Sequence, residues 1–275
     1  MVGRKDVKDF ISQEIFAFLR NPCSLHKGFQ NIMLLAESGV GKDKVASCIT
    51  HSYGMAYITV FSDEQMMSMT EFVSPFVGAS AGKTRGALFK SIERVLPANE
   101  FYDVCVGGTS ANGVRDHGID VINQTVYFCD EFKGLSRFMP IGYIQETIIQ
   151  FLGSNQGLAR RFPDSRRLIL LPYSDDELTN VLIRQLMEKE QFEIGPEEAR
   201  VLHSCVCASK QSFPDLYTTQ AGSMFNMATH ISRVLASSKD SQWRKGDSLH
   251  NCKLLKAAFN DYLWRQRGVV LKNIE

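Results

Sequence analysis

The sequence predicts an α/β domain followed by a smaller helical domain, and two observations lead to this expectation. Between residues 31 and 172, short apolar runs that suit buried strands alternate with segments of helical periodicity. After them only helical periodicities occur, at 175–190, 196–209, 222–237 and 254–266. Alternating strands and helices are typical of a parallel sheet covered by helices, and a terminal run of helices is typical of a separate helical domain.

Composition and charge exclude several classes of protein. The chain has 275 residues, of which 44% are hydrophobic and 22% charged, as in ordinary globular proteins. Its net charge of +1 gives no overall field toward nucleic acid or an anionic membrane, so we expect neither partner. Seven scattered cysteines predict reduced thiols. With no export signal and no long apolar span, we expect an intracellular, cytoplasmic protein.

Three segments make up the expected domain organisation. Residues 1–30 form a helical lead-in, because the apolar side chains of 5–20 recur at helical spacing. Residues 31–172 form the α/β domain, with a turn-rich insertion at about 97–122, and residues 173–275 form the helical lid domain. Within the α/β domain we expect strands at 31–35, 56–61, 126–129 and 168–171, and helices at 43–51, 63–72 and 82–96.

A glycine-rich turn between the first strand and the next helix points to phosphate binding. The segment Ala36–Asp43 resembles the phosphate loop G-x-x-x-x-G-K-[ST], with Ala in place of the first Gly and Asp in place of the hydroxyl residue. In such a loop, amides at a helix N-terminus surround phosphate oxygens and the Lys reaches the β- and γ-phosphates. We therefore expect a P-loop NTPase that binds a nucleotide through five consecutive residues, Gly39, Val40, Gly41, Lys42 and Asp43, with Asp43 also near Mg²⁺.

Two other strings bear on the same site. A second glycine-lysine string at 78–84 has the hydroxyl but is one residue short between its glycines and follows no strand, so we do not expect it to bind phosphate. The apolar run 126–129 ends in Asp130 and Glu131, and open α/β sheets bind ligands at the carboxyl ends of their strands. We expect Asp130 to bind Mg²⁺ and Glu131 to act as the catalytic base toward the attacking water.

These segments, in this order, resemble an AAA+ ATPase of the CbbX/SpoVK-like branch. Residues 71–85 are similar to the pore-loop segment of that family, and Gly142-Tyr143 and 154–163 (SNQGLARRFP) are similar to its Gly-Tyr and Asn-Pro-Gly-Leu-x-x-Arg-Phe signatures. Residues 172–178 are similar to its entry into the helical lid. The resemblance covers about residues 5–240. It implies an ATPase that uses ATP and Mg²⁺, assembles into a homo- or hetero-oligomeric ring and threads or remodels a protein substrate.

The resemblance also assigns roles to matching residues. Arg161, or as the alternative Arg160, corresponds to the arginine finger that reaches the γ-phosphate of a neighbouring subunit. Phe76 and Val77 correspond to the pore loop that grips a threaded peptide. From the residues alone, the two arginines can also be part of a solvated basic cluster, and Phe76 can equally be a buried anchor of its loop.

Three departures keep a second hypothesis open. Asp43 places a negative charge beside the β-phosphate, and the lid segment 219–226 offers no Arg. The short spacing between Asp130 and Gly142 predicts a truncated sensor-one strand. The alternative to an active ATPase is therefore a degenerate nucleotide-binding pseudoenzyme or scaffold with little or no hydrolysis. A P-loop kinase or GTPase fits less well, because no guanine-specificity motif is present.

Overall fold

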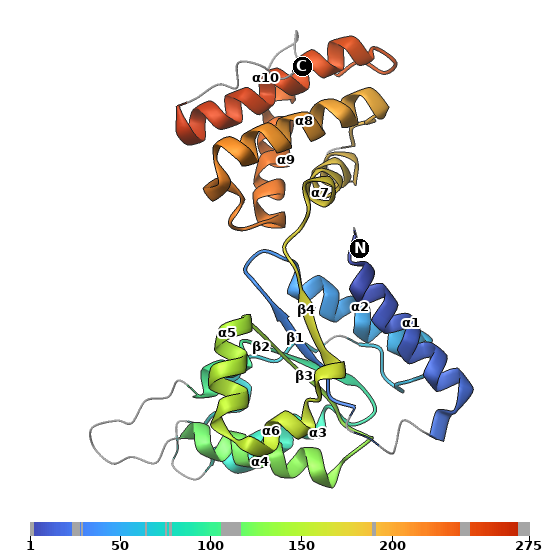
Figure 1. The fold of residues 1–275 in the computed structure, drawn as a ribbon, viewed down its shortest axis with the longest axis vertical. Coiled ribbons are helices and arrows are strands. Elements are labelled where there is room, and N and C mark those ends of the chain that lie inside the picture. Colours follow the sequence, from blue (N-terminus) through green and yellow to red (C-terminus); the bar gives the residue numbers. More distant parts are fainter. Residues whose placement is uncertain are drawn as a thin grey trace, which may run out of the picture. The chain divides into compact units, whose positions relative to one another are not determined.

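The computed structural model describes residues 3–23, 28, 30–63, 65–74, 76, 79–105, 117–188, 191–236 and 243–268. Contacts within the chain divide it into two units (Figure 1). The first unit contains the described residues of Gly3–Glu37 and Gly41–Leu171. The second contains Ser38–Val40 and the described residues of Pro172–Glu275.

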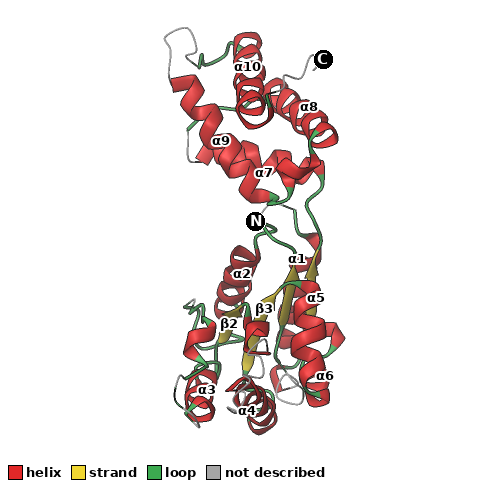
Figure 2. Ribbon diagram, turned by 90° about the vertical axis from the view of Figure 1, so that its left-hand side faces the viewer, coloured by secondary structure: helices red, strands yellow, loops and turns green. Residues whose placement is uncertain are grey.

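The first unit is built around a parallel sheet. Its strands are β1 (Met33–Ala36), β2 (Val95–Asn99), β3 (Arg137–Gly142) and β4 (Arg167–Leu170), in the spatial order β2-β3-β1-β4. Its α-helices are α1 (Lys5–Arg20), α2 (Lys42–Met55), α3 (Ser80–Phe89), α4 (His117–Glu131), α5 (Ile144–Glu146) and α6 (Gln156–Arg161). Figure 2 shows α2 on one side of the sheet and α5 and α6 on the other. The predicted α/β class is confirmed.

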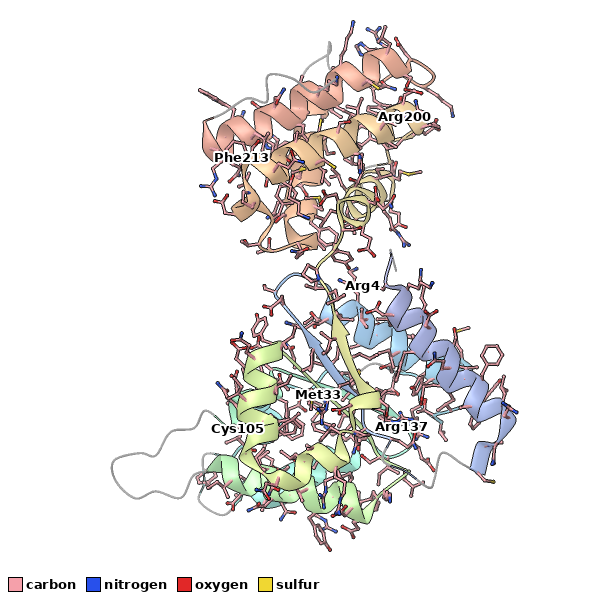
Figure 3. All side chains as sticks on the ribbon, viewed as in Figure 1. Arg4, Met33, Cys105, Arg137, Arg200 and Phe213 are labelled. Carbon is pink, nitrogen blue, oxygen red and sulfur yellow. The ribbon has the colours of Figure 1, made fainter. Side chains whose placement is uncertain are left out.

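An aromatic cluster fills the interior beside the sheet. Phe101 is its hub, in the short 3-10 helix Phe101–Cys105 that follows β2. Its ring centroid lies 4.8 Å from that of Phe72, 4.9 Å from Phe138 and 5.4 Å from Phe151, each in an edge-to-face arrangement. Met33 of β1, labelled in Figure 3, is fully buried in the same core. These contacts fix the backbone at the carboxyl end of β2.

The prediction of a strand at 126–129 is wrong, because these residues belong to helix α4. Five buried side chains recur along α4 at spacings that suit a helix: Val121, Ile122, Thr125, Phe128 and Cys129. A short apolar run fits a strand or a buried helix equally well, so only the period of the longer segment distinguishes them.

The strand next to β3 is β2, which begins just before the expected insertion at 97–122 and extends into it. Pro97 made this run look like a turn, since proline removes a donor from a sheet. The carbonyl of Pro97 accepts a hydrogen bond from the amide of Met67 at 2.8 Å, on the side of β2 away from β3. The missing N–H therefore faces the outer edge, and the pairing between β2 and β3 remains intact. Residues 106–116 of the expected insertion lie outside the described residues.

Four further expectations differ from the structure. The strand that precedes Gly142 is not truncated, because β3 is 6 residues long and lies between β2 and β1. Residues 56–61 form no strand; the amides of Val60 and Phe61 instead both approach the carbonyl oxygen of Glu93, at 2.9 and 3.2 Å. The expected helix at 63–72 is reduced to a 3-10 turn at Met69–Glu71, and the one at 82–96 ends at Phe89.

Helix α1 packs into the first unit through the buried side chains of Val7, Phe10 and Ile11 and through the carboxylate of Glu14. Glu14 accepts hydrogen bonds from the Tyr53 hydroxyl of α2 at 3.3 Å and from the Arg166 guanidinium at 2.7 Å. Tyr53 is buried, and this burial, together with the charge of Glu14, raises the pKa of its hydroxyl. The lead-in helix is therefore tied both to α2 and to the segment that precedes β4.

The second unit is helical beyond Pro172. It contains α7 (Asp175–Glu188), α8 (Pro196–Ser212), α9 (Ala221–Ala236) and α10 (Ser248–Arg267), which contact one another as a bundle. The core side chains Leu182, Leu202, Ile231 and Phe259, one from each helix, are fully buried. Across both units, no helix in the described ranges combines the length and apolarity needed to span a membrane.

We expect Phe101→Ala to lower the free energy of unfolding by about 3–5 kcal/mol, because it leaves a cavity among three packed rings. Urea denaturation followed by circular dichroism measures this change. Phe16→Ala is the matched control, because Phe16 lies on α1 with 68% of its surface exposed. Equal denaturation midpoints for the two variants would contradict the assignment of Phe101 as the hub.

Candidate functional site

Three strand ends meet at one edge of the sheet. In the parallel pairing Leu35 of β1 lies opposite Gly142 of β3, and Asn99 of β2 lies opposite Ile141 of β3. The residues that follow these strands therefore leave the sheet side by side. They are the glycine turn after β1, Glu100 after β2 and Tyr143 after β3. This edge is where open α/β sheets place their ligands.

The glycine turn has the backbone that a phosphate cradle requires. Gly39 and Gly41 adopt left-handed conformations, with φ of 72° and 85°, which residues with a Cβ rarely take. Gly41 is the N-cap of α2 and no side chain caps that end of the helix. The first amides of α2, beginning at Lys42, therefore remain suited to an anion. Val40 and Asp43 lie in the same turn, Val40 buried and Asp43 exposed.

The ammonium of Lys42 lies across this turn. Its Nζ donates to the carbonyl of Ala36 at 3.2 Å, and it lies 3.8 Å from the centroid of the Tyr143 ring. Burial lowers the pKa of Lys42, and the carboxylate of Glu100 is the largest of several negative charges that oppose this shift. Lys42 therefore links the ends of β1, β2 and β3 through contacts and charge.

Glu100 is the site residue that the sequence analysis missed. It follows β2 directly and has a φ of 49°, in the left-handed region that costs a residue with a side chain about 1–3 kcal/mol. Phe101, buried in the aromatic cluster, holds the chain in this conformation. The signal was present in the run Val95–Ala98 followed by Asn99 and Glu100, but Pro97 and the nearby glycines favoured a turn. Asn99 stands where the expected acidic pair would have its Asp.

Gly142 is required where β3 ends, because a Cβ there would lie 2.2 Å from Thr147 Oγ1 and 2.6 Å from the ring of Tyr102. The Tyr143 carbonyl accepts a hydrogen bond from the Thr147 amide at 3.0 Å, and the Tyr102 ring lies 6.2 Å from the Tyr143 ring. Residues Thr147–Leu152 then form a π-helical turn, a feature frequent at functional sites. These contacts fix the direction in which Tyr143 leaves the sheet.

The structure does not bring Asp130 and Glu131 to the glycine turn. They end α4, close to the start of β3, and neighbouring Cys129 accepts a hydrogen bond at 3.2 Å from Asn31, which precedes β1. This is the amino edge of the sheet, opposite the turn. Asp130 pairs with Arg161, and Glu131 pairs with Arg85 of α3 through both carboxylate oxygens, at 2.9 and 3.1 Å. The two acids join helices at this edge.

The two candidate finger arginines differ in exposure. Arg161 is only 5% exposed and also donates to the carbonyls of Gly157 at 2.6 Å and Val126 at 3.2 Å. Its guanidinium therefore holds α6 against α4. Arg160 is exposed at the surface of α6. In this conformation Arg160, and not Arg161, is accessible to another molecule.

The pore-loop candidates lie between the 3-10 turn and α3. Phe76 is 74% exposed, whereas Val77 lies outside the described residues. In the second glycine-lysine string, the described residues Lys83 and Thr84 make structural hydrogen bonds to backbone carbonyls. Lys83 donates to the carbonyls of Thr70 and Val73, at 2.7 and 2.9 Å, and Thr84 donates to that of Phe72 at 2.9 Å. These contacts attach α3 to the segment before Phe76.

Solved structures share this fold. A chain of the E. coli MS115-1 HORMA:CdnC:Trip13 complex matches with a TM-score of 0.53 and 12% identity, over 83% of this chain and 88% of that chain. A chain of Hsp104, solved with ATPγS and FITC-casein, matches with a TM-score of 0.59 and 14% identity, over 98% of this chain and 44% of that chain. Together with the strand order, these matches show the fold that is typical of AAA+ proteins.

Proteins that are related in sequence indicate which AAA+ proteins this chain resembles. No protein-family model matches. The chain is 26% identical over 152 residues to ESX-2 secretion system protein EccA2 of Mycobacterium tuberculosis, covering 55% of this chain and 24% of that protein. It is 28% identical over 199 residues to stage V sporulation protein K of Bacillus subtilis, covering 69% and 58%. It is 22% identical over 215 residues to the putative cfxQ-like protein R730 of Acanthamoeba polyphaga mimivirus, covering 78% and 51%.

The chain is thus a distant homologue of the EccA2, stage V sporulation protein K and cfxQ-like AAA+ ATPases, and the resemblance predicted from its sequence is confirmed. It covers less than two thirds of the length of each of these three relatives.

We expect Arg161→Ala to lower the free energy of unfolding by about 1–3 kcal/mol, because it removes a buried guanidinium with its ion pair to the half-exposed Asp130 and its two hydrogen bonds to carbonyls. Urea denaturation measures the change. Arg160→Ala, on the exposed side of the same helix, should change stability by less than about 0.5 kcal/mol. A larger loss from Arg160→Ala than from Arg161→Ala would contradict the clamp role of Arg161.

Proposed function

We propose that this chain binds and hydrolyses ATP at the carboxyl edge of its sheet and, within a ring of like subunits, uses the reaction to remodel a protein partner. The observation that carries this proposal is that Lys42 and Glu100 follow strands that end at the same edge of the sheet, beside the uncapped start of α2. The distant homology to AAA+ ATPases supports the same reaction class.

The site residues have complementary roles in this proposal. The amides at the start of α2 and the ammonium of Lys42 hold phosphate oxygens, which favours charge that develops during transfer. Glu100, and not Glu131, takes the proton from the attacking water. Its left-handed backbone is consistent with a functional position, since such strain collects at active sites.

The residues present fit Mg²⁺. No cluster of three or more His, Cys, Asp or Glu side chains that could hold a metal occurs in the part of the chain that the structure describes. Mg²⁺, however, typically takes one or two protein oxygens together with phosphates and water. Asp43 beside Lys42 and Asn99 beside Glu100 supply a carboxylate and an amide oxygen near the expected phosphates. Bound there, Mg²⁺ would neutralise phosphate charge and orient the triphosphate.

Ring assembly assigns roles to two exposed residues. Arg160 is the side chain of the arginine pair that is accessible, and we assign to it the contact with the nucleotide of a neighbouring subunit. Phe76 is an exposed aromatic ring that can contact the backbone and side chains of a bound peptide. The partner is therefore an extended segment of a protein.

The decisive test replaces each of the two candidate bases, Glu100 and Glu131, by glutamine in a separate variant. Glu100→Gln should reduce the rate of ATP hydrolysis by about 10²–10⁴-fold, because it removes the general base and keeps the side-chain shape. Phosphate release is measured with Mg²⁺ and ATP, and ATP affinity is measured by calorimetry to show that binding persists.

Glu131→Gln is the matched control, because Glu131 pairs with Arg85 at the opposite edge of the sheet. Its rate of hydrolysis should equal that of the wild type. If Glu131→Gln abolishes turnover and Glu100→Gln does not, the assignment of the base is rejected.

A second candidate function is a nucleotide-binding scaffold with little or no hydrolysis. Two substitutions at the site favour it: Asn99 stands in place of an acid, and Asp43 in place of a hydroxyl residue. The burial of Arg161 also removes one of the two candidate fingers from the surface. In this case the wild type binds ATP tightly and releases no phosphate.

Asp43→Ala, which removes the carboxylate and adds no other oxygen ligand, distinguishes the two candidates. If Asp43 holds Mg²⁺ in a working site, the variant should lose most of the affinity that Mg²⁺ adds to ATP binding. If Asp43 only repels the phosphates, the variant should bind ATP about tenfold more tightly. Calorimetric titration of ATP with Mg²⁺ and with EDTA measures both effects on the same protein. A working ATPase in which the variant binds more tightly under both conditions would contradict the Mg²⁺ role.

A further inference from the structure

We propose that Tyr143 is a positioning residue that holds the ammonium of Lys42 across the mouth of the glycine turn. Part of this inference rests on the proposed function, because the phosphates of a nucleotide are what the ammonium would then face. The carrying observation is geometric: Lys42 Nζ lies 3.8 Å from the centroid of the Tyr143 ring and 3.2 Å from the carbonyl oxygen of Ala36.

These two contacts define where the ammonium sits. Lysine has three N–H donors on a flexible stem, so a single hydrogen bond leaves it free to swing. Ala36 is the last residue of β1 and Lys42 the first of α2, so the bond between them spans the whole turn. The face of the Tyr143 ring contacts the ammonium on another side. A cation over such a face is attracted by the negative charge above the ring.

The ring itself cannot easily move away. Tyr143 follows Gly142, whose lack of a Cβ allows Tyr102 and Thr147 to pack against the backbone. The ring of Tyr102 lies 6.2 Å from that of Tyr143 at an interplanar angle of 48°. Tyr143 is also the N-cap of α5, with the extended backbone φ −73° and ψ 150°. The strand end therefore sets the direction of the ring, and the ring sets that of the lysine.

The nearby carboxylates make this support necessary. Glu100 attracts the ammonium, as do Glu146, Asp43 and Glu37 to a lesser degree. Without the ring, only the hydrogen bond to Ala36 would oppose the pull of these carboxylates, and holding a long lysine side chain in one geometry costs side-chain entropy. An aromatic face offers a site that attracts the ammonium without neutralising it. The positive charge thus stays available to an incoming anion.

A spectroscopic test uses the nucleotide-free chain. In protein labelled with ¹³C-lysine, the ε-CH₂ protons of Lys42 should resonate upfield of those of the exposed lysines, because the nitrogen bonded to this carbon lies over the Tyr143 ring. Lys42→Arg assigns the signal. The shift should persist in Tyr143→Phe and vanish in Tyr143→Leu. Tyr57→Leu is the control, since Tyr57 is 86% exposed and should leave the shift unchanged. An unshifted Lys42 signal in the wild type overturns the proposal.

Nucleotide affinity tests the consequence. Tyr143→Leu should bind ATP and ADP about tenfold more weakly and AMP with unchanged affinity, because Lys42 acts on the outer phosphates. Tyr143→Phe should retain wild-type affinities, since it keeps the ring. Equal losses for ATP, ADP and AMP, or no loss at all, would overturn the positioning role. A wild type that shows the upfield shift but binds no nucleotide would support the Lys42–Tyr143 contact and reject the proposed function.

Discussion

The parallel pairing of β1, β3 and β2 is the constraint on which the candidate site depends. Because the three strands run in the same direction and end in register, the residues after them emerge at one edge. The site brings together three residues from distant parts of the sequence. Lys42 is the first residue of α2, Glu100 is the first residue after β2, and Tyr143 is the first residue after β3. A shift of one residue in the register of β2 would turn its side chains to the other face and remove Glu100 from Lys42.

The opposite edge of the sheet uses the same residue types for a different purpose. There two acids at the end of α4 pair with arginines of α3 and α6 and hold these helices together. Charged pairs at the amino edge are structural, whereas the partly buried ammonium at the carboxyl edge remains without a bonded carboxylate in the described structure. Location relative to the sheet, more than residue type, separates a candidate catalytic group from a helix clamp.

The sequence predicted the fold class, the glycine turn and the helical second unit, because each depends on local signals. The strand before the turn, the glycines and the following helix all lie within a few residues of one another. It misplaced the acidic position because Val126–Cys129 is as apolar as a strand, and only its longer period identifies α4. It missed Glu100 because Pro97 argues against a strand, and only the outer-edge contact with Met67 explains why proline is tolerated.

The roles of Arg160 and Arg161 depended on packing that no motif encodes. Both lie in one signature string, but a helix of 6 residues places neighbouring side chains on different faces. One faces α4 and is buried, and the other faces solvent. Exposure of this kind follows from which helix lies alongside, and the identity of that helix was itself mistaken at the sequence level.

Through Glu14, helix α1 supports elements on either side of the glycine turn although α1 itself is not part of that turn. Its carboxylate is shared by the Tyr53 hydroxyl near the end of α2 and by Arg166 before β4. A shortened protein that starts at β1 would leave a buried phenol and a largely buried guanidinium without their shared carboxylate. Truncation at the amino terminus would therefore disturb both α2, which begins at the glycine turn, and β4, one of the two edge strands of the sheet.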